Sequence, residues 1–380
     1  MLESILVYYL TALIMYGLAK MASDQERALG HQIQFWCPEI LLSIILFCFI
    51  AGARYNVGVD HLSYLSEYLR LQNGFSASRE DIEPGFAFIR SLFAKSGAHY
   101  FFFFAFWAFL QIFFIYYALK DRKYLLPYVA LSIMLMYSFF LSWMNGIRQC
   151  VVECGFVFLT KYIIDRKPVK YFIGVGLLYL IHHTALILIP LYLLTYNKLT
   201  FNKKNLNLAI LFACVVIGST PTWIDIIRNF QGLVTAMGYA DYNIDNILSR
   251  DMQSTAFGPS RLSSFIVSLS IVWFYPKLKD FFVGDKYITL YFILFFIGAC
   301  GYNLFANTTF LFIRPTEYFT IFTLPLFAYV LYYLKRTNKT TAFYGLCAIA
   351  FIQIFIFVYK AAYLPYDPVS QTYLYKFFFQ

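Results

Sequence analysis

Long apolar runs, separated by short charged segments, constrain this chain more than any other feature. The hydrocarbon core of a bilayer requires about 20 predominantly apolar residues in a helix. The chain is 61% hydrophobic and only 13% charged, which is atypical of soluble domains. Candidate transmembrane helices fall near residues 3–19, 36–53, 100–119, 124–142, 147–164, 171–182, 184–196, 206–221, 262–276, 287–302, 316–334 and 341–358. The sequence therefore predicts one integral membrane domain over residues 1–380, all-α and polytopic, with about twelve transmembrane helices.

The stretch from Lys170 to Tyr196 decides the topology, because it fits either one long helix or two short helices that meet at His182 and His183. Lysine and arginine concentrate on the cytoplasmic side of membrane proteins. With two helices, one side receives the basic clusters at 120–123, 161–170, 198–204, 277–286 and 335–339. We therefore expect two helices, with both chain termini outside. The net charge of +10 then reflects cytoplasmic loops that face anionic lipid, rather than nucleic-acid binding.

The predicted outer side carries an excess of arginine over lysine. A topology signal needs only charge, whereas the planar guanidinium also binds phosphate or carboxylate in a bidentate manner. These arginines are Arg54, Arg70, Arg79, Arg90, Arg148, Arg228, Arg250, Arg261 and Arg314. Four of them abut a predicted helix end at membrane depth, which favours ligand binding: Arg54, Arg148, Arg261 and Arg314. For the other five, pairing or snorkelling on loop surfaces is an equally good interpretation.

Two long segments, residues 54–99 and 222–260, lie on the predicted outer side, which the topology makes periplasmic. In the first, Leu62, Leu65 and Leu69 recur at helical spacing, and a second apolar set follows Pro84. We therefore expect short amphipathic helices on the outer interface. The second segment is rich in Tyr, Asp and Asn, a composition that suits carbohydrate binding and equally suits an ordinary solvated loop.

A polar stripe marks the predicted helix over 147–164. Asn145, Arg148, Gln149 and Glu153 share one face about 140° wide on a helical wheel. Polar stripes within the membrane line cavities or functional sites. A structural pair of Arg148 with Glu153 is the alternative, but a separation of five residues is poor geometry within one helix. The role of Glu153 stays open between a buried structural partner and chemistry.

Three acidic or imidazole groups stand out as candidates for proton transfer. Histidine is the side chain best suited to move protons near neutral pH, and His182 would lie at the tip of the predicted elbow. Asp60 and Glu83 are outer carboxylates beside glycine or proline, although Glu83 fits a helix cap equally well. The seven cysteines have no metal-binding spacing and no DxD motif occurs, so we expect neither a metal nor a cofactor.

These residues fall into five motifs with a fixed order. They are Arg54, Gly58, Asp60 and Tyr64; then Glu83-Pro84-Gly85-Phe86; then Asn145, Arg148 and Gln149; then His182, Thr184, Ala185 and Leu186; and finally Arg314 and Tyr318. On a polytopic chain, this ordered set resembles the bacterial polysaccharide polymerases of the Wzy type, in the EpsG-like branch. The resemblance extends from about residue 50 to residue 195, and more weakly to residue 320.

The resemblance implies a reaction and a location. A Wzy polymerase transfers a glycan chain from undecaprenyl diphosphate to a sugar hydroxyl of a new lipid-linked repeat unit, on the periplasmic face of the bacterial inner membrane. The product is O-antigen or capsular/exopolysaccharide. The implied fold is that of membrane-embedded GT-C-type glycosyltransferases and O-antigen ligases. The implied partners are undecaprenyl-diphosphate-linked oligosaccharides, membrane lipids, a chain-length-regulating co-polymerase and a flippase, with no nucleic acid.

The residues fit this chemistry. A lipid diphosphate leaving group gathers charge on phosphate oxygens, which guanidinium groups can stabilise. The candidates for diphosphate binding are Arg148, Arg54, Arg314 and, more weakly, Arg261. The acceptor hydroxyl needs a base, for which the candidates are His182, then Asp60 and Glu83. Residues expected to bind glycan or to support the site are Tyr64, Asn145, Gln149 and Tyr318.

Two other classes of protein remain open. A lipid-linked oligosaccharide flippase or transporter also needs polar residues in the membrane, but it should line a path through both leaflets, whereas the special residues gather on one side. Another membrane transferase, such as an O-antigen ligase or an acyltransferase, is the second alternative. The arginine motifs around the histidine favour a diphosphate substrate over an acyl donor.

Overall fold

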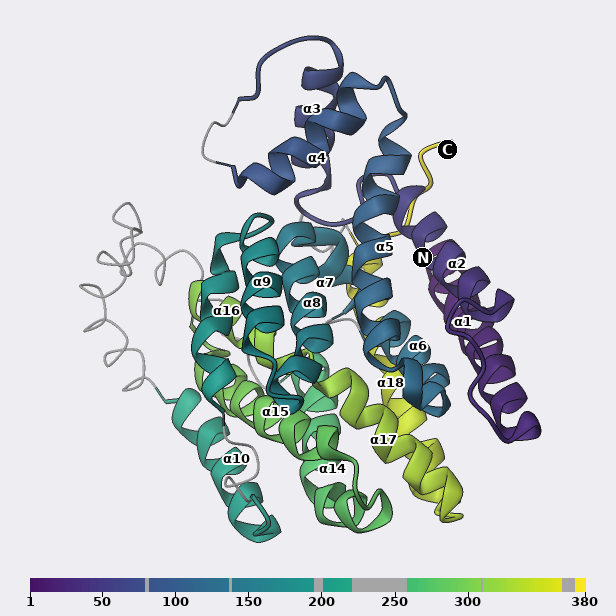
Figure 1. The fold of residues 1–380 in the computed structure, drawn as a ribbon, viewed down its shortest axis with the longest axis vertical. Coiled ribbons are helices and arrows are strands. Elements are labelled where there is room, and N and C mark those ends of the chain that lie inside the picture. Colours follow the sequence, from purple (N-terminus) through teal and green to yellow (C-terminus); the bar gives the residue numbers. More distant parts are fainter. Residues whose placement is uncertain (79–81, 137–138, 195–200, 221–257, 309, 364–372) are drawn as a thin grey trace. The chain divides into compact units, whose positions relative to one another are not determined.

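The computed structural model describes residues 1–78, 82–136, 139–194, 201–220, 258–308, 310–363 and 373–380. Within these ranges the chain is helical and forms no β-strand, apart from one isolated antiparallel bridge between Arg54 and Phe377. Figure 1 labels the helices and colours them along the sequence. The chain divides into two compact units. The first unit comprises Met1–Leu194 with Phe327–Gln380, and the second comprises Thr195–Leu326.

Apolar helices of 10 to 28 residues form the body of the first unit. They are α1 (Leu2–Leu29), α2 (Pro38–Gly52), α5 (Tyr100–Ala118), α6 (Leu126–Leu135) and α8 (Ile147–Ile164). Helix α1 packs against α2 and α6, α2 packs against α5, and α5 packs against α8. Large aromatic side chains, among them Trp107 and Trp143, are fully buried between these helices. The observed bounds of α5 and α8 match the predicted ranges 100–119 and 147–164 closely.

The predicted helix over 124–142 is interrupted. The chain instead forms the 3-10 helix η1 (Lys120–Leu125), then α6, and then the short helix α7 (Phe140–Asn145). Helix α6 ends where Met136 takes up an extended backbone conformation. Apolar composition continues through the break, which is why the sequence gives no sign of it. The long helix α18 (Thr340–Tyr363) completes the unit and packs on α1 and α6.

The stretch after α8 folds back on itself, as the prediction of two short helices requires. Helix α9 (Pro168–Tyr179) and the 3-10 helix η2 (His183–Leu193) meet at an elbow around His182. The Tyr171 hydroxyl donates a hydrogen bond of 2.7 Å to the Leu188 carbonyl and joins the two arms. The second arm contains Pro190, which lacks the N–H that a regular α-helix needs at that position.

Residues 54–99 contain two short helices, α3 (His61–Gln72) and α4 (Pro84–Lys95), in agreement with the apolar spacing. They pack against each other and against α5 around a cluster that includes Tyr68, Phe86 and Trp107. Both helices also carry exposed large apolar side chains, namely Leu62, Leu69, Phe88 and Leu92. This two-faced character is what the interfacial prediction requires, and contact with the membrane surface stays a prediction.

Both ends of the chain lie beside the start of residues 54–99. The Tyr55 N–H donates to the Lys376 carbonyl at 2.8 Å, and the Phe378 N–H donates to the Ala53 carbonyl at 2.9 Å. The Tyr375 N–H also donates to Ser4 Oγ, at 3.0 Å, near the start of α1. Figure 1 marks the two chain ends, which a hydrogen bond between Gln380 and Glu3 joins. The two termini and residues 54–99 therefore share one end of the first unit, which agrees with the predicted topology.

The second unit is built around α15 (Lys286–Phe305), which packs against α10 (Lys204–Gly218), α14 (Pro259–Phe281) and α16 (Phe310–Thr320). Glycines allow close helix contacts, as is common between membrane helices. A Cβ at Gly298 would stand 2.6 Å from the Thr320 backbone nitrogen. Helix α17 (Thr323–Arg336) begins in this unit and continues into the first.

Residues 221–257 lie outside the described ranges, and so do most of the second predicted outer segment, Arg79, Arg228 and Arg250. Within the described residues, five helical spans are long and apolar enough to cross a membrane: Leu2–Leu29, Tyr100–Ala118, Lys286–Phe305, Phe312–Arg336, which covers most of α16 and all of α17, and Thr340–Tyr363. Shorter apolar helices are Pro38–Gly52, Pro168–Tyr179, His183–Leu193 and Lys204–Gly218. These findings support a polytopic membrane protein, while the count of twelve crossings and the likeness to GT-C enzymes stay predictions.

Candidate functional site

Glu83 joins three distant parts of the first unit. It immediately precedes α4, whose first residue is Pro84. One carboxylate oxygen, Oε1, lies 2.5 Å from His182 Nδ1 and accepts a second hydrogen bond, of 3.3 Å, from the His183 N–H. The other oxygen, Oε2, accepts a hydrogen bond from Arg148 Nη1 and forms an ion pair with it. A carboxylate, a guanidinium and an imidazole therefore meet at one point.

A tight backbone contact brings Glu83 to the elbow. The N–H of Gly85 donates to the Leu180 carbonyl at 2.8 Å, and the N–H of Phe86 donates to the same oxygen at 3.3 Å. These N–H groups belong to the first turn of α4 and have no partner inside the helix. A Cβ on Gly85 would stand 2.7 Å from the Leu180 oxygen. Only glycine therefore fits where the Glu83-Pro84-Gly85-Phe86 motif meets the elbow.

Arg148 lies in the first turn of α8, and 24% of its side chain is exposed. Its guanidinium carbon is 5.3 Å from the centre of the Phe86 ring, a cation–π contact. The Tyr64 hydroxyl, on α3, lies close enough to interact with it electrostatically. The carboxylate and the ring together reduce the cost of holding a cation here. The exposed part of the guanidinium leaves it accessible to an anion.

The surroundings of Glu83 keep its carboxyl group ionised. Burial acts to raise the pKa of Glu83, but the hydrogen bond from His182 and the charge of Arg148 outweigh burial and lower the pKa to about 2. A general base works best when its pKa lies near the operating pH. Glu83 is therefore better suited to orient His182 and Arg148 than to accept a proton itself. Since Glu83 holds Nδ1 of His182, proton transfer by this imidazole falls to Nε2.

Asp60 and Asn145 connect the start of α3 to the end of α7. Asn145 Oδ1 accepts a 2.8 Å hydrogen bond from the Asp60 N–H. Gly58 has a φ of +96°, and a Cβ there would stand 3.2 Å from the Met144 carbonyl oxygen. Asn145, which lies three residues before Arg148, thus fixes the backbone that carries Asp60. The predicted proton transfer by Asp60 stays a prediction.

Arg54 is enclosed by the protein, with 1% of its surface exposed. Its Nε donates to the Val57 carbonyl at 3.2 Å, Nη2 donates to the Met144 carbonyl at 3.1 Å, and Nη1 donates to the Ala51 carbonyl. The guanidinium also lies over the Phe104 ring, 4.5 Å from its centre. This geometry favours a role in holding the backbone together, and diphosphate binding by Arg54 stays a prediction.

Gln149 and Glu153 pair with each other rather than with Arg148. Both side chains are buried, and Gln149 Nε2 donates to Glu153 Oε1 at 2.9 Å, one helical turn along α8. The carboxylate that pairs with Arg148 is instead Glu83, 65 residues earlier in the chain. For Glu153, the structure thus supplies the buried structural partner that the sequence left open. The predicted role of Gln149 in supporting the site stays a prediction.

The second unit contains the remaining predicted residues. Arg261 is buried, and its Nη1 donates to Asn307 Oδ1 at 3.0 Å, while Asn307 Nδ2 donates to the Gly218 carbonyl at 3.0 Å. This network links α14, the residues after α15, and α10. On α16, Arg314 is exposed and Tyr318 is buried. The predicted contributions of Arg261, Arg314 and Tyr318 to substrate binding stay predictions.

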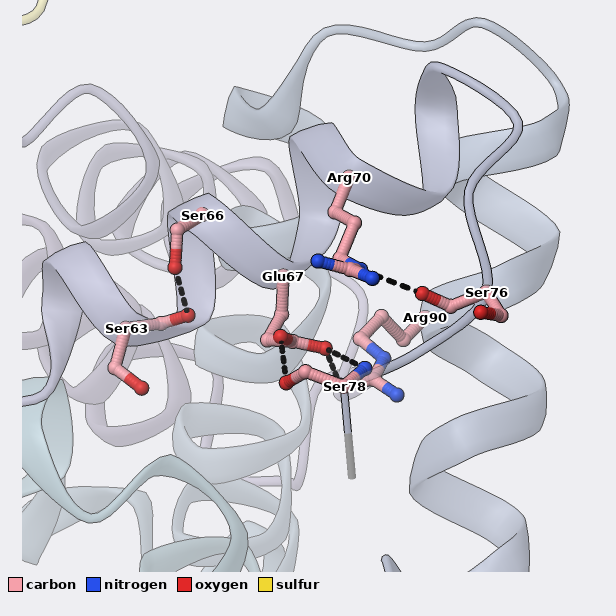
Figure 2. Close-up of polar contacts among 7 residues, drawn as sticks. All are labelled: Ser63, Ser66, Glu67, Arg70, Ser76, Ser78 and Arg90. Carbon is pink, nitrogen blue, oxygen red and sulfur yellow. Dashed lines mark hydrogen bonds and ion pairs between the residues drawn. The ribbon is translucent and has the colours of Figure 1, made fainter. Parts of the chain in front are cut away.

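A partly buried ion pair between α3 and α4 was not predicted from the sequence. Arg90, which is buried, places Nη1 3.7 Å from Glu67 Oε2 (Figure 2). Glu67 also accepts hydrogen bonds from the backbone N–H of Ser78, at 3.2 Å, and from its hydroxyl. Arg70 Nε donates to the Ser76 carbonyl at 2.7 Å. These contacts hold the helix pair that carries Glu83, and no local spacing in the sequence connects Glu67 with Arg90.

The fold and the site define a class of protein: a polytopic helical membrane protein with a carboxylate, an arginine and a histidine gathered at one end of its helices. The model of the EpsG family matches residues 40–376. The chain belongs to the EpsG family. No curated protein and no solved structure matches it. Family membership places the chain among membrane proteins of polysaccharide biosynthesis, of the polymerase type.

Proposed function

We propose that this protein is a Wzy-type polymerase that joins undecaprenyl-diphosphate-linked repeat units into a polysaccharide. The observation that carries the proposal is the shared carboxylate of Glu83, which binds both Arg148 and His182. An anion-binding group and a proton acceptor are thereby held at a fixed separation, as glycosyl transfer from a diphosphate donor requires. Membership in the EpsG family supports the same class of reaction.

The proposed step breaks the bond between the anomeric carbon of the donor glycan and the diphosphate oxygen, which leaves with the electron pair. The acceptor hydroxyl oxygen forms the new bond to the anomeric carbon. Its proton passes to Nε2 of His182, and Glu83 stabilises the resulting imidazolium through Nδ1. The products are the lengthened lipid-linked glycan and free undecaprenyl diphosphate.

Arg148 stabilises the leaving diphosphate in this scheme. A guanidinium has five N–H donors in a planar fork. One of its terminal nitrogens, Nη1, holds Glu83, so other donors remain to bind phosphate oxygens as their charge grows. Preorganised donors of this kind contribute roughly 3–4 kcal/mol of transition-state stabilisation each. Tyr64, on α3, and Phe86, on α4, position the guanidinium.

The proposed reaction takes place on the periplasmic face of the inner membrane. Glu83 belongs to residues 54–99, and both chain termini lie beside this segment. The basic loops of the sequence fall on the predicted opposite side of the membrane. The proposed partners are the lipid-linked oligosaccharides, surrounding membrane lipids, a flippase that delivers the repeat units and a co-polymerase that regulates chain length. The proposed product is O-antigen or capsular/exopolysaccharide, formed without a metal or cofactor.

Substitution of Arg148 by lysine tests the proposal. Lysine keeps the charge but loses the planar fork, so Arg148→Lys should reduce polymerisation by about a hundredfold or more. The protein should still accumulate in the membrane, and lipid-linked single repeat units should accumulate with it. Arg27→Lys, at an exposed position near the end of α1, is the matched control and should polymerise normally. Normal production of long-chain glycan by Arg148→Lys would refute diphosphate binding by Arg148.

Deletion of the gene separates this function from the flippase alternative. Loss of a polymerase leaves single lipid-linked repeat units on the outer side of the membrane. Loss of a flippase leaves them on the inner side. The proposal expects single units outside, and restored polymer when the wild-type chain is supplied again. Single units confined to the inner side would favour the flippase alternative.

A further inference from the structure

Residues 373–380 clamp the segment that leads into the site. Two backbone hydrogen bonds, from Tyr55 to Lys376 and from Phe378 to Ala53, flank the bridge between Arg54 and Phe377. The clamp therefore adds a strand-like pairing on both sides of Arg54. Isolated segments gain little from two such bonds, so additional side-chain contacts must hold the clamp in place.

Tyr375 supplies the main anchor of the clamp. Its side chain is 2% exposed, and its hydroxyl donates a 2.6 Å hydrogen bond to the Ile50 carbonyl. Ile50 lies in the last turn of α2, where carbonyl groups lack partners within the helix. The Tyr375 backbone N–H is bound by Ser4, and the ring packs edge-on against Tyr8 with the centres 5.9 Å apart. Tyr375 thus fixes the end of α2 to the start of α1.

A continuous set of contacts leads from this anchor to Arg148. Arg54 lies two residues after the end of α2, and its guanidinium binds the carbonyl of Met144. Asn145, the next residue, is held by the Asp60 N–H. Helix α8 begins two residues later, at Ile147, with Arg148 in its first turn. A shift of the end of α2 would therefore move the backbone from which Arg148 projects.

We propose that Tyr375 is a positioning residue for the transfer step: through Arg54 and Met144, it sets the place of Arg148 relative to the substrate. The inference rests on the proposed function, because Arg148 must act on the substrate for its position to matter. Catalytic groups lose effectiveness when they move by well under 1 Å. A buried hydroxyl that fixes a helix end is suited to this task.

The test is the variant Tyr375→Phe, which keeps the buried ring and removes only the hydroxyl. The turnover number of purified protein on lipid-linked repeat units should fall about fivefold, the effect of one net hydrogen bond, while KM changes less than twofold. Tyr363→Phe, at an exposed position on α18, is the matched control and should leave both constants unchanged. An unchanged turnover number in Tyr375→Phe would overturn the proposal.

A double-mutant cycle separates positioning from mere folding support. If Tyr375 acts through Arg148, Tyr375→Phe should cause no further loss of turnover in the Arg148→Lys background. Fivefold losses in both backgrounds would overturn the inference, because the two residues would then act independently. A lower yield of folded protein with normal turnover per folded molecule would also overturn it. Failure of the wild-type protein to polymerise would instead refute the proposed function.

Discussion

The substitution Gly85→Ala probes the contact that assembles the site. An added Cβ would lie 2.7 Å from the Leu180 carbonyl oxygen, whereas ordinary contacts begin at 3.4 Å. The first turn of α4 and the elbow must therefore separate by about 0.7 Å, the difference between these two distances. The same shift would lengthen the bond between Glu83 Oε1 and His182 Nδ1 from 2.5 Å to about 3.2 Å.

The expected result of Gly85→Ala is a loss of polymerisation of roughly tenfold to a hundredfold, because displacements of this size misalign catalytic groups. The cost in stability should be about 1–3 kcal/mol, small enough for the protein to accumulate. The assay is the rate of glycan lengthening by purified protein, set against the amount of folded protein. Gly176→Ala, on α9, is the matched control, because a Cβ there meets nothing within 4 Å and alanine favours the helix.

Wild-type polymerisation by Gly85→Ala would refute the reasoning. It would mean that the approach of Glu83 to His182 is not needed for turnover, or that the elbow yields without moving either side chain. A loss of activity in Gly176→Ala as well would also count against it, because the effect would then not be specific to the contact with Leu180.

Three further predictions follow from other features of the first unit. Gly58→Ala should destabilise the folded protein by about 1 kcal/mol more than Gly97→Ala, as measured by thermal unfolding. Both glycines have a positive φ, but only Gly58 lies against the Met144 carbonyl. Equal losses of stability would contradict this prediction. The folded-state pKa of Glu83 is about 2, below the usual value, so its ionised form stabilises the fold above about pH 4.5 and loses that effect as the pH falls towards 2. The free energy of unfolding of the wild type should therefore fall by roughly 2–3 kcal/mol relative to that of Glu83→Gln over this pH range. A stability difference that does not depend on pH would contradict the pairing of Glu83 with His182 and Arg148. Purified protein should polymerise in excess chelator, and strict metal dependence would overturn the arginine-based scheme.

Helices with long apolar runs were predictable from the sequence, and breaks within them were not. The range 147–164 predicts α8 (Ile147–Ile164) to the residue, because Gly146 precedes the apolar run and Asp165 begins a charged stretch after it. The range 316–334 corresponds instead to parts of two helices, α16 and α17. Apolar side chains continue across this break and across the one after α6, so hydropathy cannot detect either.

The members of the site were predictable singly, but their meeting was not. Arg148 is conspicuous because a charge in an apolar helix is costly, and His182 because it interrupts an apolar stretch. Both side chains bind Glu83 because the backbone of Gly85 contacts that of Leu180, 95 residues later in the chain. No local pattern in the sequence predicts this contact. The pairing of Arg54 with Phe377 is a tertiary contact of the same kind.

The most direct test of the central claim is reconstitution of the purified protein in liposomes with undecaprenyl-diphosphate-linked repeat units. Protein inserted in both orientations makes transport between leaflets unnecessary for the reaction. The account predicts a ladder of lengthened lipid-linked glycans, one undecaprenyl diphosphate released for each new glycosidic bond, and lengthening that is about a hundredfold slower with Arg148→Lys. Movement of unlengthened repeat units between leaflets, with no new glycosidic bond, would contradict it.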